Sequence, residues 1–269
     1  MPTGSITFDH VDKRFRGGLL ALHDVSLRVD HGEFVALVGP SGCGKTTALR
    51  LAAGLEASSR GTVDAPALHG SGASTAFVFQ EPTLMPWASA FENVWLPLRL
   101  SGVSRTAAHD RVTAMLDSVG LGEFVHAYPA ELSGGMKMRT SIARALVTEP
   151  TVLLMDEPFA ALDEITRSRL NDDLLTWCAA RRLTVLFVTH SVYEAVFLSE
   201  RVLVMSPRPG RIVAEVRIAR SLPRDQAFRT SVAYLAACRE VSNALEAGQA
   251  GNALGATNAP DSSRAEAAP

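Results

Sequence analysis

The sequence has few of the residues that would indicate a disulfide scaffold or a thiolate metal site. It contains three cysteines, Cys43, Cys178 and Cys238, and no two of them form a CxxC pair. An odd and scattered set of cysteines is typical of reduced thiols, so we expect neither disulfide bonds nor metal binding through thiolates. The sequence also lacks any apolar run close to the roughly 20 residues that a membrane-spanning helix requires.

An excess of charge is missing as well. The 26 lysines and arginines are nearly balanced by 28 aspartates and glutamates, which gives a formal net charge of −2 and a pI near 6.4. Proteins that bind nucleic acid usually carry a basic excess, so no nucleic-acid partner is expected. The opening segment, MPTGSITFDH, does not contain the charged and apolar regions of a signal peptide. We therefore expect a cytoplasmic protein that would act at a membrane only through a partner chain.

The apolar residues that are present predict an α/β fold. Four short continuous apolar runs, typical of strands buried on both faces, occupy residues 34–38, 152–155, 185–188 and 202–205. Helical sequence separates these runs, which predicts a parallel sheet with crossover helices. The chain has 269 residues, 47% of them hydrophobic, which suffices for one packed domain with an inserted lobe.

The two ends of the chain differ from this central pattern. Residues 6–15 and 22–29 alternate apolar and polar positions, as half-buried strands do. From about residue 246 to residue 269 the sequence is mainly Ala, Gly, Asn, Ser and Pro, which buries too little surface to offset the entropy of ordering. We therefore expect one ordered domain at 1–245 and a disordered tail at 246–269.

A helical region interrupts the predicted sheet at about residues 81–150. The side chains of one expected helix there recur at i, i+3, i+4 and i+7, and these residues are Val112, Met115, Leu116 and Val119. Gly120 is placed to end that helix. This region is predicted to be a helical lobe inserted into the domain.

The most specific motif is a complete GxxxxGK[ST] sequence directly after the apolar run at 34–38. It reads Gly39-Pro40-Ser41-Gly42-Cys43-Gly44-Lys45-Thr46, and helical sequence follows from Thr47. In this order of strand, loop and helix, backbone N–H groups and the helix N-terminus face a bound phosphate. We expect Lys45 to contact the β- and γ-phosphates of ATP and Thr46 to ligate Mg²⁺. The rest of the motif and Thr47 are expected to bind the nucleotide.

Polar residues follow two of the other apolar runs. Asp156 and Glu157 come directly after the run at 152–155. Because ligands of parallel sheets bind at the carboxyl ends of the strands, we expect Asp156 to hold Mg²⁺ and Glu157 to polarise the attacking water. His190 similarly follows the run at 185–188, although one histidine at a strand end is more often a structural hydrogen-bond partner.

A phosphate loop alone is compatible with kinases, GTPases and many ATPases, and residues 132–136 narrow this choice. Their sequence, Leu-Ser-Gly-Gly-Met, resembles the LSGGQ signature motif of ABC ATPases. There Ser133, Gly134 and Gly135 would open a helix whose N–H groups meet a phosphate from outside the chain's own site. The resemblance extends over about residues 6–212. It implies a P-loop NTPase (RecA-like) core with a parallel sheet, an N-terminal antiparallel β subdomain and an inserted helical lobe.

The resemblance also implies roles for residues that spacing alone does not assign. Phe15 matches the aromatic residue that stacks on adenine, and Gln80 matches the glutamine that approaches Mg²⁺ and the attacking water. Asp163, in Ala161-Leu162-Asp163, matches the loop that crosses to a partner subunit. His190 matches the switch histidine that contacts the γ-phosphate, so it joins Glu157 and Gln80 as a candidate catalytic residue.

Three positions depart from the commonest family pattern. Met136 and Met138 stand where glutamines are common, and Ala160 stands where a serine is common. None of these changes removes a group assigned to the chemistry. They are expected to affect the strength of coupling between subunits.

Within the family, residues 82–87, 188–198 and 206–212 resemble the importer branch for nitrate, sulfonate, taurine and pyrimidine-type solutes. This implies a head-to-tail homodimer in which each ATP lies between one phosphate loop and the other chain's Ser133. It also implies integral membrane permease subunits, a separate solute-binding protein and a location on the inner face of the cell membrane. Trp87 and its neighbours would face the permease.

Three alternatives stay open at this point. A P-loop kinase or GTPase would explain residues 39–46 but not residues 132–136, and the sequence has no Asn-Lys-x-Asp guanine motif. A soluble ABC ATPase that acts on nucleic acid or ribosomes usually has two cassettes or long coiled coils, whereas this chain has one cassette and no heptad stretch. Only the importer-like segments at residues 82–87, 188–198 and 206–212 argue against an ABC exporter ATPase.

Overall fold

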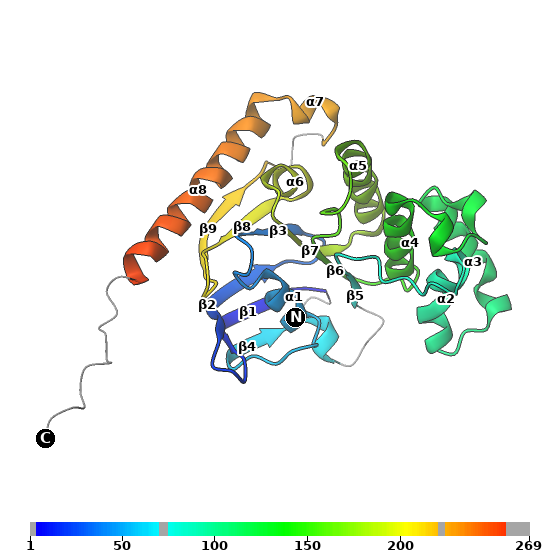
Figure 1. The fold of residues 1–269 in the computed structure, drawn as a ribbon, viewed down its shortest axis with the longest axis horizontal. Helices are drawn as coiled ribbons and strands as arrows, with labels where there is room; N and C mark the ends of the chain where they lie inside the picture. Colours follow the sequence, from blue (N-terminus) through cyan, green and yellow to red (C-terminus); the bar gives the residue numbers. More distant parts are fainter. Residues whose placement is uncertain (1–3, 70–74, 220–223, 257–269) are drawn as a thin grey trace, which may run out of the picture.

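A computed structural model describes residues 4–69, 75–219 and 224–256, with only the helical backbone described for 251–256. The described chain forms two sheets, surrounded by helices (Figure 1). The strands are β1 (Ile6–Arg14), β2 (Leu20–Val29), β3 (Phe34–Val38), β4 (Arg60–Asp64), β5 (Thr75–Val78), β6 (Val152–Asp156), β7 (Thr184–Thr189), β8 (Arg201–Met205) and β9 (Ile212–Arg217). The helices are α1 (Lys45–Ala52), α2 (Ala90–Leu100), α3 (Arg105–Ser118), α4 (Gly134–Leu146), α5 (Glu164–Arg181), α6 (Val192–Leu198), α7 (Gln226–Arg229) and α8 (Val232–Ala256). Short 3-10 helices lie at Pro66–His69, Gly122–Phe124 and Pro129–Glu131.

The larger sheet has the strand order β5-β6-β7-β3-β8-β9, and every pair in it is parallel except β8 with β9. Its central strands contain the four continuous apolar runs, so the prediction of a parallel sheet with crossover helices is confirmed. β3 shows why such a run lacks alternation. Phe34, Ala36 and Val38 pack into one hydrophobic core, whereas Val35 and Leu37 pack into a second core on the other face of the sheet.

The second core joins the larger sheet to the N-terminal strands. β1 pairs antiparallel with both β2 and β4, which confirms the predicted N-terminal antiparallel β subdomain. Ile6 and Phe8 of β1 share this core with Leu49 of α1 and Leu37 of β3. Helix α1 therefore lies between the two sheets (Figure 1).

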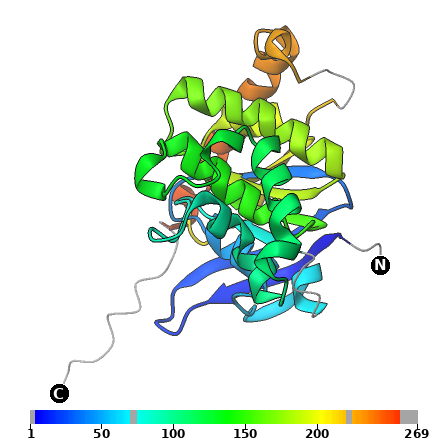
Figure 2. The same cartoon turned by 90° about the vertical axis from the view of Figure 1, so that its right-hand side faces the viewer.

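The helical lobe forms one end of the molecule, where α2, α3 and α4 lie together (Figure 2). Helix α2 begins with a capping box in which Ser89 accepts a hydrogen bond from the backbone N–H of Glu92, while the Glu92 carboxylate accepts one from that of Ser89. The four predicted core positions, three in α3 and Val119 at its C-cap, are all buried, including Val112 and Leu116 at 0% exposure. The lobe thus shares the first hydrophobic core with the sheet.

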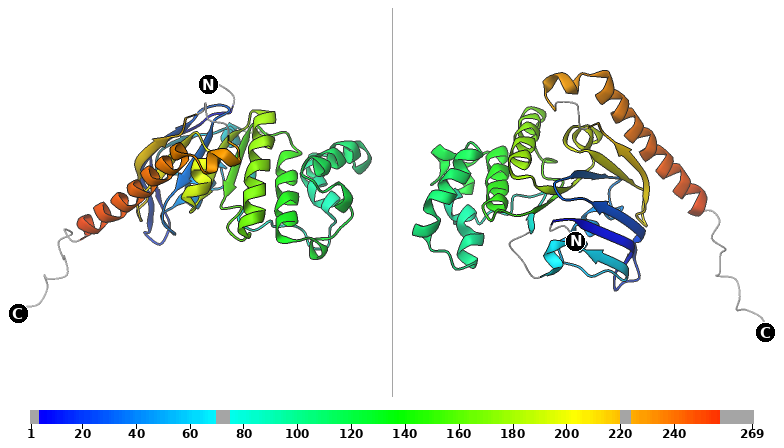
Figure 3. Two further views of the ribbon diagram at one scale, coloured as in Figure 1. Left: turned by 90° about the horizontal axis from the view of Figure 1, so that it is seen from above. Right: turned by 180° about the vertical axis from the view of Figure 1, so that it is seen from behind.

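The C-terminal region requires a correction. Helix α8 continues through Ala256, so residues 246–256, which we expected to belong to a disordered tail, are helical. Tyr234, Cys238 and Val241 bury the first part of α8 against the main core, and the alanine-rich sequence that follows has a high helix propensity. The rest of the predicted tail, 257–269, lies outside the described residues. Figure 3 shows α8 at the side of the molecule opposite the helical lobe.

No helix in the described part of the chain combines the length and the apolar character that crossing a bilayer requires.

Candidate functional site

The phosphate loop lies between the carboxyl end of β3 and the first turn of α1, as its sequence predicts. Gly42 and Gly44 have φ values of 74° and 110°, which glycine adopts without strain. A side chain on Gly44 would also lie 2.9 Å from the carbonyl oxygen of Ala21 in β2. The loop is therefore built tightly against the N-terminal sheet, with backbone turns that only glycine accommodates readily.

A second loop, between β8 and β9, packs against the phosphate loop. The Arg208 guanidinium donates a hydrogen bond of 3.0 Å from Nε to the carbonyl oxygen of Gly42. A Cβ on Gly210 would lie 2.1 Å from the carbonyl oxygen of Cys43, so this glycine permits the close approach. Residues 206–212 resemble the importer branch in sequence, but their contact with the phosphate loop was not predicted.

Lys45 points back into the phosphate loop. Its ammonium group is 2.8 Å from the carbonyl oxygen of Gly39 and 3.1 Å from that of Pro40, and the side chain is only 5% exposed. The same nitrogen lies 3.6 Å from Oε1 of Glu157. A buried cation in a loop of backbone N–H groups makes a site with high affinity for phosphate oxygens.

Thr46 and Asp156 bring two oxygen ligands together. Thr46 Oγ1 donates a hydrogen bond of 3.0 Å to Asp156 Oδ1. Mg²⁺ in nucleotide sites is usually held by one or two protein oxygens, with phosphates and waters completing its shell. These two residues fit such an ion, and the described residues contain no cluster of three or more His, Cys, Asp or Glu that would form an all-protein metal cage. The sequence prediction for Thr46 and Asp156 is therefore compatible with the geometry.

Asp156 should lower the stability of the nucleotide-free protein. Burial raises the pKa of Asp156 above its ordinary value, although the hydrogen bond from Thr46 opposes the shift. When the pKa of a carboxyl group is higher in the folded state than in the unfolded state, the protein is most stable below the unfolded pKa, where the group is protonated in both states. That stability is lost as the pH rises through the folded pKa. Ionised Asp156 is therefore unfavourable for folding at neutral pH.

We expect the Asp156→Asn variant without nucleotide to have a higher midpoint of thermal unfolding than wild type at pH 7.5. The difference should shrink as the pH is lowered toward 4, because wild-type Asp156 then becomes protonated. Thermal unfolding across this pH range measures both effects, and Asp110→Asn, which changes an exposed side chain, serves as the control. A variant that is less stable than wild type at pH 7.5 would mean that the Thr46 contact outweighs desolvation.

Glu157 and His190 meet at the carboxyl edge of the sheet. His190 Nδ1 lies 2.8 Å from Glu157 Oε2, and the two side chains are 58% and 21% exposed. Glu157 has a φ of 45°, a left-handed conformation that is strained for a residue with a side chain. Its backbone N–H donates to the carbonyl oxygen of Val188 in β7, which fixes the turn. Lys45 and His190 therefore both lie close to the Glu157 carboxylate, and the three side chains form one polar cluster.

Gln80 and Phe15 lie at the edges of this site. Val78, the last residue of β5, pairs with Met155, so the exposed Gln80 follows at the same sheet edge as Asp156. Phe15 is half-buried in the turn after β1, and its backbone N–H donates to the carbonyl oxygen of Leu19 just before β2. The Lys13 ammonium group lies 5.1 Å from the centre of the Phe15 ring. The phosphate loop approaches β2 at Ala21, two residues after Leu19. Phe15 therefore lies on the same side of the molecule as the phosphate loop.

The signature segment lies elsewhere, in the helical lobe. Ser133 is the N-cap of α4 and accepts a hydrogen bond from the backbone N–H of Met136. α4 packs against α2, α3, α5 and β5, whereas α1 packs against β2, β4, β6 and β7. Ser133 and Gly134 are exposed, and Gly135 is buried against Thr166. The structure thus does not bring this segment to the phosphate loop of its own chain.

Asp163 lies beside the signature segment. It is the N-cap of α5, where its carboxylate accepts a hydrogen bond of 3.0 Å from the backbone N–H of Thr166 and is otherwise exposed. This hydrogen bond is the main reason that the pKa of Asp163 is lowered.

Two of the positions that depart from the family pattern are compatible with the fold. Met138 is 2% exposed within the core, and Met136 packs against the same core.

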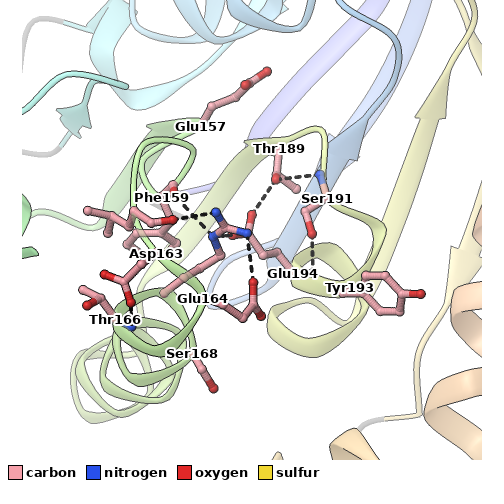
Figure 4. A network of polar contacts seen from close by, with 12 residues as sticks. Glu157, Phe159, Asp163, Glu164, Thr166, Ser168, Thr189, Ser191, Tyr193 and Glu194 are labelled. Carbon is pink, nitrogen blue, oxygen red and sulfur yellow. Dashed lines mark hydrogen bonds and ion pairs between the residues drawn. The ribbon is translucent and has the colours of Figure 1, made fainter.

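Sequence reasoning missed a polar network behind the site (Figure 4). Glu194 of α6 accepts a hydrogen bond of 2.6 Å from Thr189 Oγ1, directly before His190. Arg167 of α5 contacts both Glu194 and the loop that ends at Asp163. Nothing local in the sequence distinguishes these two residues from ordinary charged helix positions.

Comparisons with known proteins agree with this geometry. The family model described as ABC transporter matches residues 22–160. The chain is 46% identical over 218 residues to the aliphatic sulfonates import ATP-binding protein SsuB 2 of Pseudomonas syringae pv. tomato, covering 80% of this chain and 89% of the relative. It is also 46% identical over 213 residues to the nitrate import ATP-binding protein NrtD of Synechocystis sp., covering 78% of this chain and 79% of the relative.

The fold has the same kind of neighbours. A dimeric ATP-binding cassette in a post-hydrolysis state, bound to ADP and Pi, superposes with a TM-score of 0.70 at 31% identity, covering 80% of this chain and 99% of the other. The resemblance that residues 132–136 and the surrounding motifs indicated is confirmed, and the kinase and GTPase alternatives have no support. The chain belongs to the ABC transporter family, as an ATP-binding subunit whose activity is ATP hydrolysis coupled to transport.

Proposed function

We propose that this chain is the ATP-hydrolysing subunit of an importer for a small, anionic or nitrogen- or sulfur-containing solute, and that it works as a head-to-tail homodimer on membrane permease subunits. The carrying observation is the separation within one chain of two half-sites. Lys45, Glu157 and His190 form one half, and Ser133 forms the other half in the helical lobe. Since neither half is complete alone, a second copy is needed to close the site.

The residues divide the work on ATP as follows. The phosphate loop and Lys45 bind the triphosphate, with the half-buried Phe15 available to stack on the adenine. Mg²⁺ held by Thr46 and Asp156, and approached by Gln80, would neutralise phosphate charge when bound. Glu157 orients the attacking water and accepts its proton, while His190 fixes the Glu157 carboxylate and contacts the γ-phosphate. The partner's signature helix would contact the same phosphates from outside.

The permease is proposed to dock beside the loop that follows Gln80. A groove of about 360 Å³ lies there, with walls that include Phe79, Thr83 and Leu100. Trp87, four residues after Thr83 in the sequence, is 75% exposed, and tryptophan is enriched at binding hot spots. Such docking would hold the protein at the inner face of the membrane, in a transporter that also uses a separate solute-binding protein. The names of the sulfonate and nitrate import relatives support the solute class.

Affinity purification tests this proposal. Tagged protein isolated from its native membranes in mild detergent should carry a polytopic permease with it. Trp87→Ala should reduce the recovered permease by at least about ten-fold, as the loss of an interface hot spot does. Val232→Ala, at another apolar position that is 84% exposed, should leave recovery unchanged. Recovery of ribosomes or nucleic acid, with no permease, would contradict the importer assignment.

A further inference from the structure

Arg167 ties the loop between β6 and α5 to the body of the protein. Its Nη2 donates a hydrogen bond of 2.7 Å to the carbonyl oxygen of Leu162, and its Nε donates one of 3.3 Å to that of Phe159. Both carbonyls belong to residues 158–163, the loop that runs from Glu157 to Asp163. A planar guanidinium that bonds two carbonyls fixes the loop more rigidly than a single contact could.

Glu194 of α6 forms an ion pair with the same Arg167 guanidinium. Its side chain is 7% exposed, and its Oε1 lies 3.5 Å from Arg167 Nε. Its Oε2 accepts the hydrogen bond from Thr189 Oγ1, and Thr189 Oγ1 in turn accepts one of 3.0 Å from the backbone N–H of Ser191. His190 lies between Thr189 and Ser191, so the backbone on both sides of the histidine is held by this network (Figure 4).

The loop also contacts the signature helix. A Cβ on Gly135 would lie 2.6 Å from Cγ2 of Thr166, which means that the bare backbone of α4 packs on the first turn of α5. Asp163 caps that same turn. The segments proposed to face a partner subunit therefore contact each other, and Arg167, in the same first turn of α5, connects them to Glu194.

The ion pair between Arg167 and the buried Glu194 makes this connection stiff. If Arg167 followed the loop at 158–163 away from α6, Glu194 would be left as an unpaired charge in a buried position, which is strongly unfavourable. The loop and the strand end that carries His190 are consequently expected to move together.

We propose that Arg167 and Glu194 are positioning residues that couple the partner-facing loop at Asp163 to His190 and Glu157 of the same chain. Contact with the partner's nucleotide at Asp163 would then set the position of the histidine at the chain's own nucleotide. This inference rests on the roles proposed above for Asp163 and His190, and it adds the connection between them.

A double-mutant cycle tests the coupling. Asp163→Asn removes the carboxylate but keeps a good helix cap, and Glu194→Gln removes only the charge behind the switch histidine. Each single variant should lower kcat for ATP hydrolysis about ten-fold, and the double variant should lower it no further than the larger single effect, since both act through one network. The Kd for ATP of Glu194→Gln should stay within about two-fold of wild type, because this change leaves the phosphate loop untouched. Glu164→Gln, which removes only the exposed partner of Arg167, should leave kcat unchanged.

Two results would overturn the proposal. One is a double variant whose loss equals the product of the single losses, about a hundred-fold, as independent sites give. The other is an unchanged kcat in either single variant. If Glu194→Gln fails to fold, Arg167→Lys, which keeps the charge but cannot bond both loop carbonyls, takes its place in the cycle with the same expected non-additivity. Failure of the proposed function is seen separately, when the tagged wild-type protein recovers no permease from its native membranes.

Discussion

Glu157→Gln will bind Mg-ATP with near wild-type affinity and hydrolyse it about a thousand-fold more slowly, as expected when a general base is removed. Glutamine has the same shape as glutamate and can still meet His190 Nδ1, which lies 2.8 Å from Oε2 in the wild type. It cannot accept a proton from the attacking water. The backbone strain at φ 45° is unaffected by the change, so the turn that aims the side chain should persist.

The variant should also accumulate as a nucleotide-bound dimer. If ATP links the phosphate loop of one chain to Ser133 of the other, slow hydrolysis leaves that link in place and the dimer population rises by mass action. Single-turnover hydrolysis and size-exclusion chromatography with and without Mg-ATP measure the two effects. Glu240→Gln, an exposed glutamate on α8, is the matched control and should behave as wild type. Normal turnover in Glu157→Gln would remove this residue from its assigned role.

Local sequence carried most of the information about the phosphate-binding half of the site. Gly39 to Thr46 directly follow a buried strand, and Asp156 and Glu157 lie at the end of another. A parallel sheet brings such strand ends to one edge, so their meeting could be predicted before the structure was known. His190 could be placed at that edge for the same reason, although its hydrogen bond to Glu157 could not.

The parts that the sequence did not predict lack a local pattern. β4, with the sequence Arg-Gly-Thr-Val-Asp, contains one large apolar residue, and β5 is only four residues long. Both are strands because neighbouring strands pair with them. The end of α8 was misjudged for a different reason. Composition suggested that residues 246–256 could not order themselves, but a helix already packed on the core can continue through alanine-rich sequence.

The contact between Arg167 and Glu194 is a part of the site that the sequence likewise did not predict. The two residues are 27 positions apart, and each follows a helix N-cap, where charged residues are common (Asp163 for α5 and Ser191 for α6). Only packing of α5 beside α6 brings Arg167 Nε to 3.5 Å from the Glu194 carboxylate. Long-range charge pairs of this kind require the tertiary structure, which is why motifs revealed the reacting groups but not the residues that position them.

Lys45→Ala should abolish hydrolysis by a different route, through loss of ATP binding. We expect the Kd for ATP to rise about a hundred-fold, because a buried, charge-assisted contact to the phosphates disappears. The side chain is 5% exposed and lies 3.6 Å from Glu157, so its removal also leaves that carboxylate without its cationic neighbour. Negative charge would then face the γ-phosphate, which further weakens binding. Equilibrium titration with a fluorescent ATP analogue measures the change.

The comparison of Lys45→Ala with Glu157→Gln separates binding from chemistry at one site. Both variants should lack turnover, but only Glu157→Gln should retain nucleotide and form stable dimers with Mg-ATP. Arg50→Ala removes an exposed cation from the last turn of α1, the helix that begins with Lys45, and should keep Kd within about two-fold of wild type, since exposed charges contribute little. Tight ATP binding by Lys45→Ala would mean that the backbone N–H groups and the N-terminus of α1 suffice to hold the phosphates. The buried lysine would then act on the reaction itself, through its 3.6 Å contact with the Glu157 carboxylate.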